Sequence, residues 1–136
     1  MTESWQTRWP VRMSLGLVAG AVMAAVDNVL FEGEVSPIVI VGMLFVTTVT
    51  AGMWWGWRGW VAVVAAWAWI PGSHVAKQAL GLPDTLHPNT YASILFLAAF
   101  TFGVSAIGTA CGVLAHRITS GGPSQAEAGA SAHSGA

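Results

Sequence analysis

The side chains that could do chemistry gather in one stretch of this chain, residues 60–89. The stretch begins as an apolar run and then carries four ionisable side chains, His74, Lys77, Asp84 and His87, together with the amide of Gln78. His74 precedes Lys77 by three residues and Gln78 by four, so in a helix these three side chains share one face. Imidazole, ammonium and carboxylate groups brought together can bind an ion, move a proton or pair with one another.

The rest of the chain has few such groups. Charged residues make up 8% of its 136 residues and hydrophobic residues 54%, and the mean hydropathy is +0.63. A soluble domain typically has about 25% charged residues, so lipid is the expected surroundings of most of this chain. The net charge of −1 provides no basic stripe for phosphates, which argues against nucleic acid as a partner.

Catalytic and metal-binding motifs are missing from the sequence. Ser73 and His74 are neighbours, and adjacent residues on a helix point apart, so they cannot form a nucleophile–base pair. Nothing resembles a GxSxG, Walker or GxGxxG motif. Histidine with carboxylate suits zinc, but no HxxxH or HExxH pair exists, and the single cysteine, Cys111, excludes a CxxC motif. We therefore expect neither an enzyme nor a metal or other cofactor.

Four apolar segments are predicted to cross a membrane as helices: residues 13–31, 37–54, 59–80 and 90–117. At about 1.5 Å per residue, each is long enough to cross or nearly cross about 30 Å of hydrocarbon. The sequence thus predicts an all-α integral membrane protein, a four-transmembrane-helix bundle formed by residues 13–117. Residues 1–12 form a polar lead. The low-complexity residues 118–136 cannot bury enough apolar surface to fold and are expected to be a disordered tail.

Two features leave alternatives open. Val22-Met23-Ala24 resembles a signal-peptide cleavage site, although the apolar run continues beyond it and three more segments follow. Pro71-Gly72 interrupts the third segment, because proline frees a carbonyl and bends a helix. The third helix is therefore expected to be kinked or interrupted at Pro71-Gly72, as one bent helix or as two half-helices.

The basic residues predict the orientation in the membrane. Four of the five Lys and Arg residues fall on one side of a four-crossing chain: Arg8, Arg12, Arg58 and Arg117. The positive-inside rule then places both termini in the cytoplasm of a multi-pass protein of the cell membrane. The opposite, outer ends of the helices carry most of the remaining polar groups: Asp27, Asn28, Glu32, Glu34, His74, Lys77, Gln78, Asp84 and His87.

Asp27 lies within the first apolar segment, and Lys77 is the only cation expected at its depth. Because a charge in hydrocarbon costs several kcal/mol unless it is paired or hydrated, we expect these two residues to pair. Three hypotheses follow. The pair is structural; or it belongs to an ion or substrate pathway with Asn28, His74 and Gln78; or histidines and carboxylates hold a metal or haem.

Small residues predict where helices pack closely. The last segment carries a face of small residues that includes Ser105, Gly108 and Gly112, and the first carries Gly16 and Gly20. Such faces let another helix approach. The sequence therefore favours a structural or accessory subunit that self-associates or packs in a membrane complex, with the bilayer as its surroundings. The alternative is a small channel or carrier for ions or protons that uses Asp27, His74 and Lys77.

Overall fold

A computed structural model describes residues 9–27, 37–84, 86 and 90–120 of the chain. The regular elements in these residues are α1 (Trp9–Ala25), α2 (Pro37–Trp55), the short 3-10 helix η3 (Gly56–Gly59), α3 (Trp60–Trp67), α4 (Trp69–Leu80) and α5 (Tyr91–Ser120). All of them are helical, so the prediction of an all-α chain is confirmed for this part of the protein. α1 begins within the predicted polar lead, and α5 continues past the predicted start of the tail.

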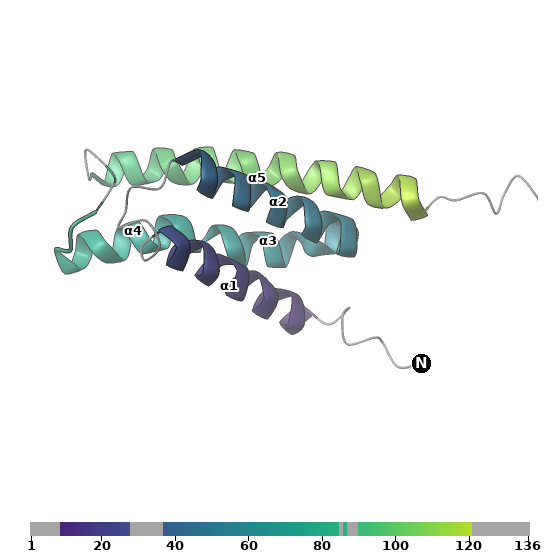
Figure 1. Cartoon of the computed structure of the whole chain (residues 1–136), viewed down its shortest axis with the longest axis horizontal. Coiled ribbons are helices and arrows are strands. Elements are labelled where there is room, and N and C mark those ends of the chain that lie inside the picture. The colour runs from purple at the N-terminus through teal and green to yellow at the C-terminus, as the bar shows by residue number, and fades with distance from the viewer. Residues whose placement is uncertain (1–8, 28–36, 85, 87–89, 121–136) are drawn as a thin grey trace, which may run out of the picture.

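The helices run back and forth along one axis, so that α2 is antiparallel to both α1 and α3 (Figure 1). The reversal between α2 and α3 occurs at η3, where Gly56 has a φ of +56°. This left-handed conformation is available to glycine without a side-chain clash. The start of α1 and the end of α5 lie at the same end of the molecule as η3, whereas the loop after α4 lies at the opposite end (Figure 1). We call these the η3 end and the α4 end.

By length and composition, two helical stretches could cross a membrane: Ile38–Leu80 and Tyr91–Ser120. The first stretch includes the reversal at η3, so it contributes two antiparallel rods, α2 and α3–α4 (Figure 1). The mean hydropathy is 1.8 for Ile38–Leu80 and 2.0 for Tyr91–Ser120. α1 is a shorter apolar helix of 17 residues. The helical surface exposes many large apolar side chains, as expected for helices that face lipid.

The third predicted segment departs from helical regularity at Ala68 and not at Pro71-Gly72. α4 runs through Pro71 and Gly72 without a break, so of the two alternatives, one bent helix or two half-helices, the half-helices that separate there are wrong. Ala68 has a ψ of −22°, typical of a 3-10 turn, and its carbonyl still accepts a 3.0 Å hydrogen bond from the Gly72 nitrogen. Because Pro71 has no N–H for the carbonyl four residues earlier, its effect falls one turn upstream.

Two helix pairs dominate the packing: α2 with α5, and α1 with α3. A Cβ atom added to Gly52 of α2 would lie 2.7 Å from the Thr109 carbonyl oxygen of α5, and one added to Gly16 of α1 would lie 2.7 Å from the Ala62 Cα of α3. Both pairs therefore depend on glycine. The predicted packing residues are all buried: Gly16, Gly20, Ser105, Gly108 and Gly112. Their small-residue faces serve contacts within the chain.

Candidate functional site

The turn at the end of α4 brings the residues that follow it back onto the helix. Gly81 adopts a left-handed conformation with φ 67°. Its nitrogen donates to the Gln78 carbonyl at 3.3 Å, and the Leu82 nitrogen donates to the Lys77 carbonyl at 2.9 Å. This glycine cap ends the helix and reverses the chain direction, so that Asp84 returns to the last turns of α4.

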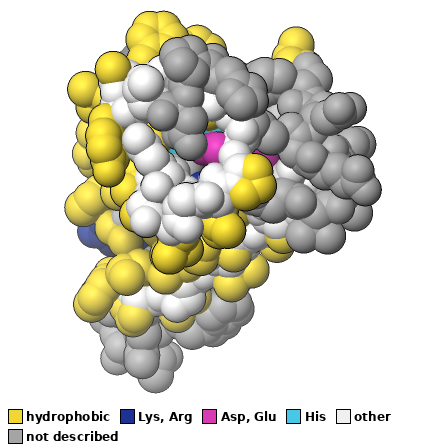
Figure 2. Space-filling view, turned by 90° about the vertical axis from the view of Figure 1, so that its left-hand side faces the viewer, with side chains coloured by type: hydrophobic (Ala, Val, Ile, Leu, Met, Phe, Trp, Pro, Cys, Tyr) yellow, Lys and Arg dark blue, Asp and Glu magenta, His cyan; other side chains and the backbone are white. Residues whose placement is uncertain are grey.

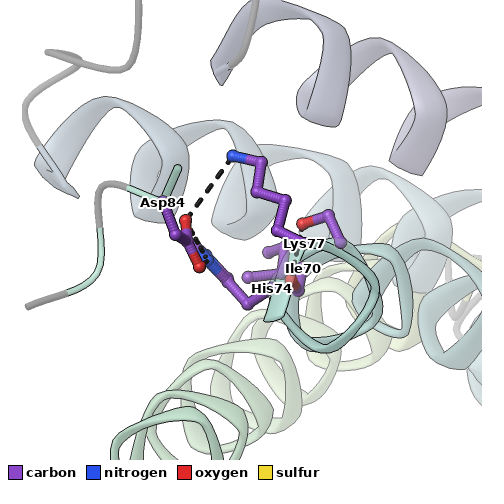
Figure 3. Close-up of polar contacts among 5 residues, drawn as sticks. Ile70, His74, Lys77 and Asp84 are labelled. Carbon is purple, nitrogen blue, oxygen red and sulfur yellow. Dashed lines mark hydrogen bonds and ion pairs between the residues drawn. The ribbon is translucent and has the colours of Figure 1, made fainter. Parts of the chain in front are cut away.

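Asp84 binds two side chains of α4, through hydrogen bonds with His74 and an ion pair with Lys77, in a cluster that we call the Asp84 clip: His74, Lys77 and Asp84 (Figure 3). His74 Nδ1 lies 2.8 Å from Asp84 Oδ2 and 2.9 Å from Oδ1. Since an ionised carboxylate only accepts hydrogen bonds, Nδ1 carries the hydrogen. Lys77 Nζ lies 3.5 Å from Asp84 Oδ1. A hydrogen-bond donor and a cation thus stabilise one carboxylate.

The Asp84 clip is shielded from solvent to different degrees. The Asp84 side chain is 0% exposed, His74 10% and Lys77 19%. Figure 2 looks onto the α4 end, where acidic side-chain atoms lie recessed behind neighbouring atoms. A covered carboxylate requires donors for its oxygens, because burying an unpaired charge is costly. The contacts of His74 and Lys77 meet this requirement.

The expected pair between Asp27 and Lys77 is not formed. Asp27 is half-buried in a π-helical turn that follows α1, and no ion pair links it to Lys77. The sequence analysis paired Asp27 with Lys77 because both residues were expected at the same depth in the membrane. However, Asp84 is closer along the chain, and the turn at Gly81 places it within reach of Lys77 first.

The other predicted site residues fall into two groups. Gln78 lies one turn beyond His74, and its Oε1 is buried without a hydrogen-bond donor in the described part of the protein. Four further residues lie outside the described ranges: Asn28, Glu32, Glu34 and His87. The described residues hold no group of three His, Cys, Asp or Glu side chains that could bind a metal ion.

A second set of polar contacts, which the sequence did not predict, lies at the η3 end. Arg12 is only 7% exposed, although it was assigned to the polar lead. Its Nη1 donates to the carbonyl oxygen of Arg58 at 3.0 Å, and its buried Nε has no acceptor among the described residues. This bond ties α1 to η3.

His116 makes a similar contact from α5. Its Nδ1 lies 2.7 Å from the Met53 carbonyl oxygen near the end of α2. The signal for this contact was present in the sequence, because basic side chains near a helix end often bind terminal carbonyls. The sequence does not say which helix provides the carbonyl. Here His116 of α5 binds a carbonyl of α2 and not one of its own helix.

Comparisons of the chain with protein-family models, curated proteins and solved structures found no match. The function is therefore argued from the geometry of this chain alone.

Proposed function

We propose that the chain is a small integral membrane protein that crosses the bilayer four times and acts as a structural or accessory subunit. The observation that carries this proposal is the Asp84 clip. His74 and Lys77, two of the three side chains that the sequence offered for transport, bind Asp84, and the side chain of this carboxylate is 0% exposed. Such a cluster holds the loop after α4 against its helix and leaves little room for a substrate.

Helix lengths support four crossings. α2 has 19 residues, and α1 has 17, which corresponds to about 26 Å for the shorter one. Spanning helices range from about 17 to 25 residues. α3 and α4 together form a third rod, and α5, with 30 residues, exceeds the hydrocarbon thickness. Alternation of these rods along one axis (Figure 1) is the arrangement that four crossings require.

The distribution of charge supports cytoplasmic termini. Arg12, Arg58 and Arg117 belong to the η3 end, whereas Lys77 belongs to the α4 end and is paired with Asp84. The positive-inside rule weighs basic residues near the ends of spanning helices. The η3 end is thus the cytoplasmic end under this proposal, and the Asp84 clip faces outward.

The first test asks what the clip does for stability. Asp84→Asn removes the charge that His74 and Lys77 bind, so we expect the free energy of unfolding to fall by about 1.5–3 kcal/mol. Thermal unfolding in detergent, followed by tryptophan fluorescence, measures the change. Asp27→Asn is the matched control, because this acid has no hydrogen bond or ion pair within the described residues. Equal effects of the two substitutions would contradict a structural clip.

A small channel or carrier for ions or protons is the second candidate, favoured by the presence of a histidine and a lysine on one carboxylate at the outer end. Reconstitution into proteoliposomes separates the two functions. A structural subunit should leave proton and potassium flux at the level of protein-free vesicles. Flux above that level that is lost in both Asp84→Asn and Lys77→Met would establish the carrier and overturn the structural role.

A further inference from the structure

A groove runs along the outside of α3 and α4, on the side where α1 begins. Its volume is about 530 Å³, and its walls include Met13 and Leu17 of α1 and Trp60 and Trp69 of α3–α4. Pockets for small ligands have volumes of about 300–1,000 Å³. A helix is roughly 10 Å across or wider, so a groove of this volume accepts an acyl chain whole but only the side chains of a helix.

The groove is long and apolar. Its lining residues extend from Trp60 to Ala76, about 24 Å of helix at about 1.5 Å per residue. One leaflet of the hydrocarbon core is about 15 Å deep. The lining carries no charge, and its one hydroxyl, Ser73 Oγ, already donates to the Ile70 carbonyl at 2.9 Å. The groove therefore suits a hydrocarbon chain and no polar ligand.

The chain carries a cation in η3, directly before the part of α3 that lines this groove. Arg58 is exposed and stands two residues before Trp60, and the bond from Arg12 to its carbonyl holds η3 against the first turn of α1. The Arg58 side chain has no ion pair among the described residues. The described part of the chain contains two acidic residues, Asp27 and Asp84. Both lie in segments near the α4 end, away from Arg58 (Figure 1).

We propose that this groove binds one acyl chain of an anionic phospholipid whose phosphate is held by Arg58. Guanidinium binds phosphate through two parallel hydrogen bonds, and the exposed Trp57 and Trp60 suit the headgroup level of a membrane. A second copy of this chain is a poorer occupant of the groove. A two-fold axis along the membrane normal would bring a second Arg58 to the same end, where the two like charges repel each other. The inference rests on the proposed membrane location.

Native mass spectrometry of the full chain tests the proposal with phosphatidylglycerol and phosphatidylcholine that carry the same acyl chains. We expect one retained lipid, with preference for phosphatidylglycerol. Arg58→Ala should reduce that preference about fivefold, the effect of one basic residue on an anionic lipid surface. Arg117→Ala, at the same end of the molecule, is the control and should change it less.

A second pair of variants tests the acyl chain. Gly72 lines the groove, and a Cβ there would meet nothing within 4 Å, so Gly72→Phe fills the groove without a clash inside the fold. We expect retention of both lipids to fall at least fivefold. Gly103→Phe is the control, because Gly103 is equally open but lies on α5 outside the groove.

Three other results of these lipid-binding experiments would contradict the proposal. Unchanged lipid retention in Gly72→Phe, equal effects of the two arginine variants, or loss of a dimer mass in Gly72→Phe would overturn the lipid site. Alkaline carbonate extraction of vesicles distinguishes this failure from that of the proposed function. Chain that is extracted contradicts the membrane location, whereas chain that stays embedded without lipid preference contradicts the lipid site only.

Discussion

The two helix pairs of this protein reach close contact in different ways. In α2–α5, glycines lie on both helices: a Cβ on Gly112 would stand 2.9 Å from the Gly52 Cα. In α1–α3, the glycines lie only on α1, and Gly16 and Gly20 face Ala62 and Ala66. Both contacts therefore bring backbone against backbone, but the first has glycine on both helices, whereas the second has glycine on α1 and alanine on α3.

Buried hydroxyls separate the pairs further. α5 carries Thr101, Ser105 and Thr109, all buried, and α2 carries buried Thr48. Each hydroxyl donates to a carbonyl of its own helix, so these groups pack as small, satisfied side chains that need no partner across the interface. The comparison teaches that α2–α5 is the more extensive contact and has glycine on both helices, while α1 lies at the edge of the bundle (Figure 1) and has room to adjust.

The largest expected effect breaks the α2–α5 pair. Gly112→Leu would drive a side chain into the backbone of α2 at Gly52 and Met53, which no rotamer change relieves. We expect a loss of about 3 kcal/mol or more in the free energy of unfolding, measured by thermal unfolding in detergent. Gly103→Leu on the same helix meets open space and should stay within about 0.5 kcal/mol of the native chain. Similar losses in both variants would mean that α5 does not pack through Gly112.

A smaller effect is expected in the α1–α3 pair. Gly16→Leu would meet the Ala62 backbone, but α1 is an edge helix and can shift away. We expect a loss of about 1–2 kcal/mol in the same unfolding measurement. Gly42→Leu is the control, since a Cβ there has no neighbour within 4 Å. A loss equal to that of Gly112→Leu would remove the distinction between the two pairs.

The smallest effect concerns a bond that joins the pairs. Trp67 Nε1 of α3 lies 3.0 Å from Thr101 Oγ1 and 3.2 Å from the Ala98 carbonyl oxygen of α5. Trp67→Phe keeps an aromatic ring beside Phe102 but removes the donor. Hydrogen bonds between membrane helices contribute about 0.6 kcal/mol on average, so we expect a loss of that order. A loss above that of Gly16→Leu would show that this bond, and not the glycine contact, holds α3 in place.

The sequence predicted the positions of the helices better than it predicted which helices pack against each other. Apolar length located the described α-helices, with α3 and α4 as one segment and without η3, since apolar segments in a membrane must satisfy their backbone hydrogen bonds internally. Small residues at Gly16, Gly20, Gly108 and Gly112 marked faces that pack. They could not say that α5 packs with α2, because glycine permits close approach without selecting a partner.

The polar contacts were harder to predict for two reasons. The Asp84 clip depends on the turn at Gly81, and the depth argument that favoured Asp27 ignored how the chain bends locally. The glycine cap was readable in the sequence, since Gly81 follows Leu80 and Pro83 comes two residues later. At the η3 end, Arg12 was assigned to the polar lead before the first helix, yet Pro10 permits the helix to begin before it.

The α2–α5 contact also has a consequence for the order of assembly. Synthesis proceeds from the N-terminus, so α1 and α3 are both complete before α5 exists. During that interval the glycine face of α2 has no helix against it, although Gly52 makes its closest approach to α5 in the finished protein. The most extensive helix contact in the molecule is thus the last to form during synthesis, and the arrival of α5 completes the fold.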